Sequence, residues 1–145
     1  AIEKMALLGG NCGEPGHGLT GTTPLHAHLE QPEVPAVVYV SEVSHNFMGN
    51  AYCYGGGHYR RSHVKHALVG SSLEDSRGLE VIPPSDESID YHFGLSEECK
   101  VGETVVMAFR FQIFVTRSDV VLVEGISSGR PQIVGVYDSL GRKKG

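Results

Sequence analysis

The chain has 145 residues, with 12 lysines and arginines against 17 aspartates and glutamates, which gives a formal net charge of −5. This length suits one domain with a core of its own. The only basic cluster is 142–144 (RKK), so we expect no nucleic-acid partner. No apolar run is long enough to cross a bilayer, so we expect no membrane partner either. Three cysteines without disulfide-framework or zinc-ribbon spacing predict a cytoplasmic protein.

The first residues have helical composition. Residues 1–8 (AIEKMALL) predict a short helix, and Gly9 and Gly10 are a stop signal behind it. No capping residue precedes this helix, so we expect the chain to be part of something longer.

A glycine-rich loop follows at residues 13–18 (GEPGHG). Three glycines and a proline in six residues can continue neither a helix nor a regular strand. The backbone N–H groups of such a loop can converge on an anion such as a phosphate. Gly16 and His17 would supply these donors, while Glu14 would face a ligand group that carries a proton.

Strand formers dominate from residue 35 onwards. Short apolar or alternating segments are separated by turn signals, which predicts an antiparallel β-barrel or sandwich and a mainly β fold. The predicted strands are 35–45, 50–54, 65–69, 79–82, 104–108, 111–116, 120–124 and 133–137, with 89–95 as a strand or turn.

Two polar clusters stand where predicted strands end. Residues 52–61 (YCYGGGHYRR) are dense in tyrosine, histidine and arginine. A tyrosine, whose pKa is ordinarily near 10, acts as a general base only where cations lower that pKa, as Arg60 and Arg61 could do. The alternative is a solvated turn with tyrosines at a strand edge. Residues 85–92 (SDESIDYH) bring carboxylates and hydroxyls together, or form an acidic surface loop.

The histidines offer a second interpretation. His26 and His28, with Glu30 or Glu33, are similar to the metal-binding HxH…E pattern of cupin barrels. Side chains at positions i and i+2 of a strand share a face, so two imidazoles could hold one metal ion. Prolines flank the carboxylate, however, and no second cupin motif follows. We therefore assign no metal ligand and keep a cupin-like metal-binding barrel as the alternative.

The order of these pieces resembles the C-terminal part of alanine racemase-like enzymes, the fold-type III family that uses pyridoxal 5′-phosphate (PLP). In that family a TIM barrel holds the cofactor, and a β-domain follows that packs against the barrel of a second subunit. The resemblance implies that residues 1–24 are the end segment of the PLP-binding barrel and that residues 25–145 are the C-terminal β-domain. It also implies a homodimer whose Schiff-base lysine lies outside this chain, so that the chain alone is inactive.

The resemblance assigns roles to the glycine-rich loop. Residues 14–19 (EPGHGL) are similar to a loop whose first residue faces the pyridine nitrogen and whose glycine and next residue bind the phosphate. Glu14, Gly16 and His17 would take these roles. Racemases carry arginine at the first place and related decarboxylases carry glutamate. A carboxylate keeps the nitrogen protonated and the ring a strong electron sink, which leaves racemisation, decarboxylation and elimination all open.

The resemblance also names residues in the β-domain. Residues 53–57 with Arg60 and Arg61 are similar to the turn that bears the racemase's catalytic tyrosine, which makes Tyr54 the expected acid/base. Residues 88–90 (SID) are similar to a segment that lines the neighbouring subunit's site, so we expect Asp90 and Arg60 to bind an amino-acid substrate.

Two further stretches complete the resemblance. Residues 100–103 (KVGE) are similar to a Val-Gly-Asp that begins a following strand, and Ser128 stands where racemases place a phosphate-binding tyrosine. The His-x-Cys zinc pair of D-serine dehydratases is missing, because residues 109–112 read FRFQ.

Three hypotheses therefore stand. The first is the C-terminal β-domain, together with the last barrel segment, of a PLP-dependent enzyme, a racemase (isomerase) or a lyase, acting at the α-carbon of an amino acid. The second is the cupin-like barrel with His26 and His28. The third is a non-catalytic assembly module that serves dimerisation.

Overall fold

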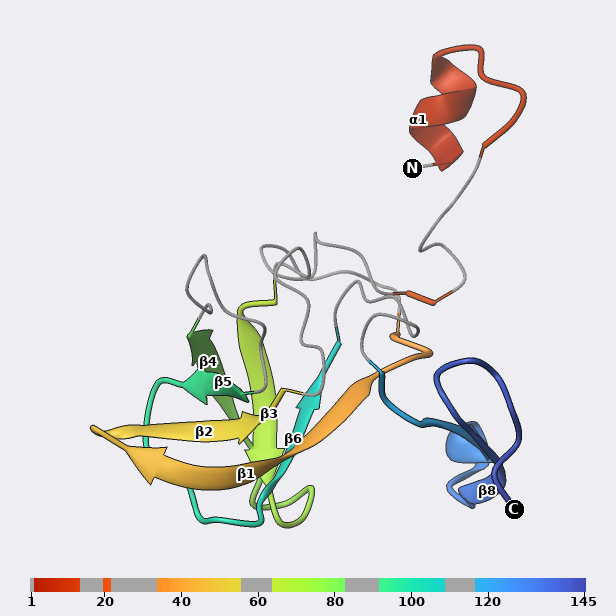
Figure 1. Ribbon diagram of the computed structural model, residues 1–145. Coiled ribbons are helices and arrows are strands. Elements are labelled where there is room, and N and C mark those ends of the chain that lie inside the picture. Colours follow the sequence, from red (N-terminus) through yellow and green to blue (C-terminus); the bar gives the residue numbers. More distant parts are fainter. Residues whose placement is uncertain (1, 14–19, 22–33, 56–63, 83–91, 109–116) are drawn as a thin grey trace.

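A computed structural model describes residues 2–13, 20–21, 34–55, 64–82, 92–108 and 117–145 (Figure 1). Strands account for nearly all of the regular structure in these ranges, which confirms the mainly β prediction. The predicted strand 111–116 lies outside the described residues. The elements are α1 (Ile2–Leu7), β1 (Tyr39–Phe47), β2 (Asn50–Tyr54), β3 (His66–Gly70), β4 (Arg77–Ile82), β5 (His92–Leu95), β6 (Thr104–Met107), β7 (Val120–Glu124), η3 (Ile126–Ser128) and β8 (Gln132–Tyr137).

Helix α1 ends at the predicted stop signal. Gly9 has a φ of 75°, a left-handed conformation that glycine adopts without strain. The N–H groups of Gly9 and Gly10 donate to the carbonyls of Ala6 and Met5 at 3.0 and 2.9 Å, so the last helical carbonyls have partners. In the described part of the chain, no helix has the length and apolar character that a membrane span needs.

Six strands form a closed antiparallel barrel in the order β1-β2-β5-β4-β3-β6 (Figure 1). Each strand pairs with two others, so the six strands leave no open sheet edge among themselves. Strands β7 and β8 form a separate two-stranded sheet. Of the two predicted architectures, the structure has the barrel.

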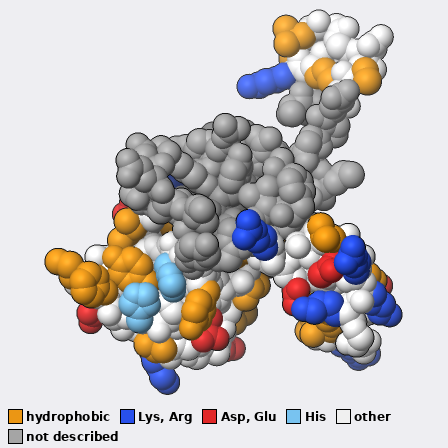
Figure 2. All heavy atoms as spheres, in the orientation of Figure 1, with side chains coloured by type: hydrophobic (Ala, Val, Ile, Leu, Met, Phe, Trp, Pro, Cys, Tyr) orange, Lys and Arg blue, Asp and Glu red, His pale blue; other side chains and the backbone are white. Residues whose placement is uncertain are grey.

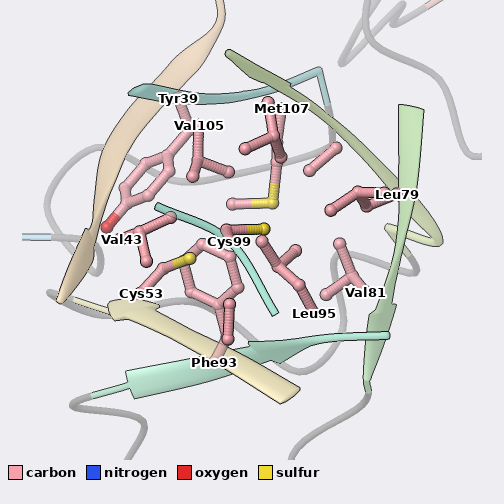
Figure 3. Close-up of a cluster of buried hydrophobic side chains, with 13 residues drawn as sticks. Tyr39, Val43, Cys53, Leu79, Val81, Phe93, Leu95, Cys99, Val105 and Met107 are labelled. Carbon is pink, nitrogen blue, oxygen red and sulfur yellow. The ribbon is translucent and has the colours of Figure 1, made fainter. Parts of the chain in front are cut away.

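The barrel is filled by two inward-facing residues of every strand (Figure 3). Side chains at i and i+2 face the same side of a strand, so two inward residues from each strand are enough to fill the interior. Cys99, from the segment between β5 and β6, joins them. The buried apolar residues are Tyr39, Val43, Ala51, Cys53, Ala67, Val69, Leu79, Val81, Phe93, Leu95, Cys99, Val105 and Met107.

Strand β1 begins and ends later than predicted, at Tyr39 and Phe47 instead of residues 35 and 45. Its start coincides with the first pair to β6, Tyr39 with Met107. Its end is set by the turn into β2. Met48 and Gly49 have φ values of 51° and 82°, which are typical of the two-residue type I′ hairpin turn. Strand β2 matches its predicted bounds, 50–54.

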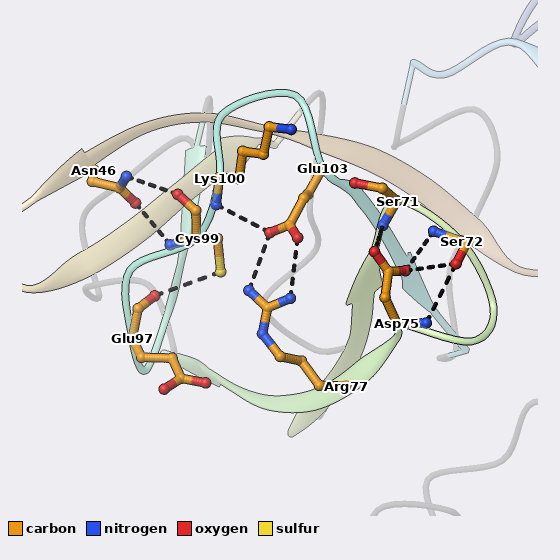
Figure 4. Close-up of polar contacts among 9 residues, drawn as sticks. All are labelled: Asn46, Ser71, Ser72, Asp75, Arg77, Glu97, Cys99, Lys100 and Glu103. Carbon is orange, nitrogen blue, oxygen red and sulfur yellow. Dashed lines mark hydrogen bonds and ion pairs between the residues drawn. The ribbon is translucent and has the colours of Figure 1, made fainter.

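One end of the barrel is closed by polar contacts (Figure 4). The Asn46 amide nitrogen donates to the Cys99 carbonyl at 2.8 Å, and the Cys99 N–H donates to the Asn46 Oδ1 at 3.1 Å. Lys100 to Glu103 then form a turn with a Glu103 N–H to Lys100 carbonyl bond of 3.1 Å. Gly102 has a φ of 89° there, which suits the third position of a type II turn.

Candidate functional site

Tyr54, the predicted acid/base, is the last residue of β2, and its side chain is 55% exposed. Its main chain is held from β1: the Ser41 hydroxyl donates to the Tyr54 carbonyl at 2.6 Å, and the Tyr39 hydroxyl donates to the carbonyl of Gly55. Strand β1 therefore holds the main chain at Tyr54 and at the residue after it, while the phenol faces outwards. A side chain on a rigid strand end is suited to precise chemistry.

Tyr54 lines a groove of about 390 Å³ on the barrel. Strand β1 contributes Glu42, which is paired in register with Thr104 of β6. Val43 pairs with Cys53, so the antiparallel register brings Glu42 towards Tyr54. A phenol, a carboxylate and a hydroxyl thus face one groove, which suits a small polar molecule. The residues that line it are Tyr39, Val40, Ser41, Glu42, Tyr54 and Thr104.

The two tyrosines of the groove differ in whether their hydroxyl groups can contact a ligand. Tyr39 is only 6% exposed, and its hydroxyl is used by the Gly55 carbonyl. Burial raises the pKa of Tyr39, which keeps this phenol protonated. For Tyr54, no hydroxyl hydrogen bond comes from the residues that the structure describes. Tyr54 is therefore the phenol that a ligand in the groove can reach.

A β-bulge at Ser44 changes which face the second half of β1 presents. Val43 faces the core opposite Cys53, but the next aligned pair is His45 with Tyr52, so Ser44 is the extra residue. Without the bulge, strict alternation would turn His45 inwards with Val43. With it, His45 joins Tyr52 on the outer face. The Ser44 hydroxyl contacts the Tyr52 carbonyl at 2.8 Å and the His45 Nδ1 at 2.9 Å.

Four rings then form a cluster on the outside of β1, β2 and β5. His45 stacks on Tyr52 with ring centroids 5.1 Å apart and planes at 9°. His92, which pairs with Tyr54 in register, meets His45 edge-to-face at 5.4 Å and Tyr54 at 5.8 Å. Figure 2 shows histidine side chains gathered on this face next to hydrophobic ones. The cluster adjoins the groove, because Tyr54 belongs to both.

The segment predicted to begin a strand, 100–103, does lead into β6. Its last residue, Glu103, is 8% exposed and accepts two hydrogen bonds from the Arg77 guanidinium, each of 3.1 Å (Figure 4). The N–H of Lys100 donates to the same carboxylate at 3.1 Å. The Arg77 hydrogen bonds hold the pKa of Glu103 below its ordinary value. This ion pair closes the end of the barrel.

Ser128, the predicted phosphate contact, lies in η3 between β7 and β8. Its hydroxyl donates to the Gly125 carbonyl at 2.9 Å, within its own loop. Figure 1 shows this hairpin apart from the end of β2 that carries Tyr54. Within the single chain, the structure does not bring Ser128 and Tyr54 together.

The other predicted site residues lie outside the described residues, so their roles stay predictions. They are Glu14, Gly16, His17, Arg60 and Asp90, together with His26 and His28 of the metal-binding alternative. Among the residues that are described, no group of three or more histidines, cysteines, aspartates or glutamates is placed to hold a metal ion.

The sequence interpretation missed Glu42, Thr104, His45 and His92. Alternation along β1 was a usable signal for Glu42, since it stands one position before an inward valine. No local signal reveals the ring cluster. His45 and His92 are 47 positions apart in the sequence, and the bulge that turns His45 outwards is a property of the strand pairing.

Comparison with known proteins shows which proteins this domain is similar to. A protein-family model described as "YhfX-like, C-terminal domain" matches residues 38–133, which include all six barrel strands. The chain is also 52% identical over 148 residues to "Uncharacterized protein YhfX" of Escherichia coli (strain K12). That match covers 100% of this chain and 38% of the relative's length, so most of the relative lies outside it.

Proposed function

The chain belongs to the YhfX-like C-terminal domain family, and we propose that it is the C-terminal β-domain of a longer PLP-dependent enzyme. The longer enzyme would act at the α-carbon of an amino acid, by racemisation or by decarboxylation or elimination. The single observation that carries the proposal is the placement of Tyr54. It stands at a strand end, with a fixed backbone and an exposed phenol, in a groove that offers other polar groups.

Tyr54 would move a proton at its phenolic oxygen. Its exposure lets a substrate from outside the domain approach, and the two main-chain contacts from β1 hold its position. Glu42 and Thr104 in the same groove could orient the polar groups of an amino acid. The hydrogen bonds to the carbonyls of Tyr54 and Gly55 matter because a general acid or base must lie within hydrogen-bond distance of the group whose proton it moves.

The described residues fit PLP only in part. The predicted phosphate loop lies outside them, and the Ser128 hydroxyl is already donated to Gly125. The lysines in the described ranges are exposed, and Lys144 is paired with Asp119 at 2.6 Å. We therefore propose that the cofactor is held mainly by the part of the enzyme outside this domain. When bound, PLP supplies an electron sink for the α-carbon.

The proposed enzyme is a homodimer assembled through the β-domain. The support is the apolar hairpin β7–β8, where Val121, Leu122, Ile133 and Val134 are each 46–69% exposed. Apolar side chains on both faces of a two-stranded sheet leave much apolar surface in water, and such surfaces commonly mark interfaces. In a dimer, this domain would offer Tyr54 to the partner's cofactor.

The test uses the longer protein that contains this chain. Purified protein should carry PLP, seen by its visible absorbance band, and should exchange the α-hydrogen of at least one amino acid with deuterated water. Replacing Tyr54 by Phe removes one hydroxyl from an exposed site. We expect hydrogen exchange to fall by roughly two to four orders of magnitude while the absorbance band persists.

Tyr52→Phe is the matched control, since Tyr52 lies two residues earlier on the same face of β2. Its exchange rate should stay close to the parent's. If Tyr54→Phe exchanges the hydrogen as fast as Tyr52→Phe, Tyr54 is not the acid/base, and His58 is the next candidate. A protein that binds no PLP would overturn the proposed function itself.

A further inference from the structure

The pair of histidines on the outer barrel wall, His45 and His92, is not used by the proposed function. Both side chains are exposed, and their ring centroids are 5.4 Å apart with planes at 78°. They come from β1 and β5, which flank β2 on either side, so three hydrogen-bonded strands set their separation. Their relative position is therefore a property of the barrel and not of a mobile loop.

The hydrogen bonds of Ser44 determine which nitrogen of His45 carries a proton. A serine hydroxyl has one hydrogen, and the Tyr52 carbonyl, which can only accept, lies 2.8 Å from it. The hydroxyl hydrogen is thus used on that carbonyl. The contact of 2.9 Å between the Ser44 Oγ and the His45 Nδ1 is then a hydrogen bond only if Nδ1 is the donor.

In the neutral imidazole, a proton on Nδ1 leaves the lone pair on Nε2. Histidine ligands of metals commonly have this arrangement, with one ring N–H donated to a neighbouring group that orients the ring. His45 is therefore a preoriented ligand with its Nε2 available. For His92, no hydrogen bond to either ring nitrogen comes from the described residues, so a nitrogen of this ring is available as well.

The spacing of the rings fits a tetrahedral ion. With zinc–nitrogen bonds of about 2.1 Å and tetrahedral angles, the centres of two ligating imidazoles lie roughly 5 Å apart. The observed distance is 5.4 Å. The near-perpendicular ring planes do not conflict with a shared ion, because a ligating ring can take any angle about its own metal–nitrogen bond. Both rings would turn a nitrogen towards the ion when it binds.

We propose that His45 and His92 bind a divalent transition-metal ion of the zinc class on the outer wall of the barrel. The two remaining positions of a tetrahedral ion would be filled by water or by a ligand atom from another molecule. The ion would stand beside Tyr54, whose ring centroid is 5.8 Å from that of His92. The proposal does not depend on PLP, since it uses only residues of this domain.

The test titrates the 145-residue chain with zinc sulfate by isothermal calorimetry. His45→Gln and His92→Gln each remove one ligand from an exposed site, and each should weaken zinc binding about tenfold or more, a loss measured as a change in Kd. His66→Gln is the matched control, because His66 is an exposed histidine on β3 of the same barrel. It should bind zinc as the parent does.

Two further measurements test the role of Ser44 and the protonation of the His45 ring. Ser44→Ala keeps both imidazoles but removes the hydroxyl that orients His45, and should weaken zinc binding about tenfold. Long-range ¹H–¹⁵N spectra of the metal-free chain should show His45 protonated at Nδ1, and zinc should shift its Nε2.

An Nε2–H form of His45 in the metal-free chain would contradict the basis of the proposal. Zinc binding that is equally strong in the parent and in the variant that lacks both His45 and His92 would overturn it, because the ion would then be held by other residues. Circular dichroism of each variant, compared with the parent, establishes that the barrel is intact.

Discussion

Replacing Glu103 by Gln tests how the end of the barrel is held closed. Glu103 accepts two hydrogen bonds from Arg77 and one from the Lys100 N–H, all of 3.1 Å. Glutamine has nearly the same shape, but its amide nitrogen is a donor and would face another donor on one side. The variant therefore loses the charge of the ion pair and at least one hydrogen bond to a charged group.

The expected cost is about 2 kcal/mol of the free energy of unfolding. A hydrogen bond to a charged group contributes about 1.5–3 kcal/mol, and the lower part of that range applies because the Arg77 side chain is 38% exposed. A loss of about 2 kcal/mol lowers the folded-to-unfolded ratio roughly 30-fold. Urea unfolding of the 145-residue chain, followed by circular dichroism at pH 7, measures the change.

The effect should also depend on pH. The pKa of Glu103 is lowered from its ordinary value of 4.5 by the Arg77 hydrogen bonds, so the folded state binds a proton less readily than the unfolded chain does. The stabilisation by the ion pair is complete at pH values above the ordinary pKa of a glutamate. It is lost as the pH falls through the lowered pKa of Glu103. The difference between parent and Glu103→Gln should therefore shrink in acid.

Glu80→Gln is the control, since Glu80 is an exposed residue of β4. It should change the free energy of unfolding by less than about 0.5 kcal/mol. A Glu103→Gln variant that is as stable as Glu80→Gln, or a difference that stays constant from pH 7 to acid, would refute the assignment of Glu103 as the closing residue.

Two more predictions concern the buried cysteines and the hydrogen bonds that hold the Cys99 backbone. Burial raises the pKa of the Cys53 thiol to about 12, and it also raises the pKa of the Cys99 thiol. A maleimide should therefore label the exposed Cys12 quickly and the other two cysteines only in denaturant, as measured by mass spectrometry. Rapid labelling of Cys53 in the folded chain would contradict its burial. Asn46→Ala removes both hydrogen bonds to the Cys99 backbone and should cost about 1–3 kcal/mol in urea unfolding, whereas an unchanged midpoint would mean that these bonds do not hold the β5–β6 connection.

Much of the fold could be predicted from local chemistry. Alternating apolar residues in 50–54 and 79–82 predicted strands whose inward side chains now form the core, because a strand repeats every two residues. Gly9 and Gly10 predicted the end of the helix for a similarly local reason. The role of Tyr54 is assigned by resemblance alone, whereas its exposure at the end of β2 is a property of the structure.

Other features depend on which strands pair. The closed order, with β5 between β2 and β4, requires contacts between residues far apart in the chain. Glu103 could be placed before a strand, but its partner Arg77 is 26 residues away and becomes a neighbour only when β3, β4 and β6 join.

The ring cluster shows most clearly the difference between what local sequence determines and what strand pairing determines. Composition reveals that the chain has eight histidines, but not that His45 and His92 meet. The two rings meet for two reasons. The bulge at Ser44 turns the side chain of His45 to the outer face of β1, and β2 pairs with both β1 and β5. Local sequence determined which residues can form strands, because alternation is a property of one strand. The tertiary structure decided register and neighbours, because these depend on hydrogen bonds between strands.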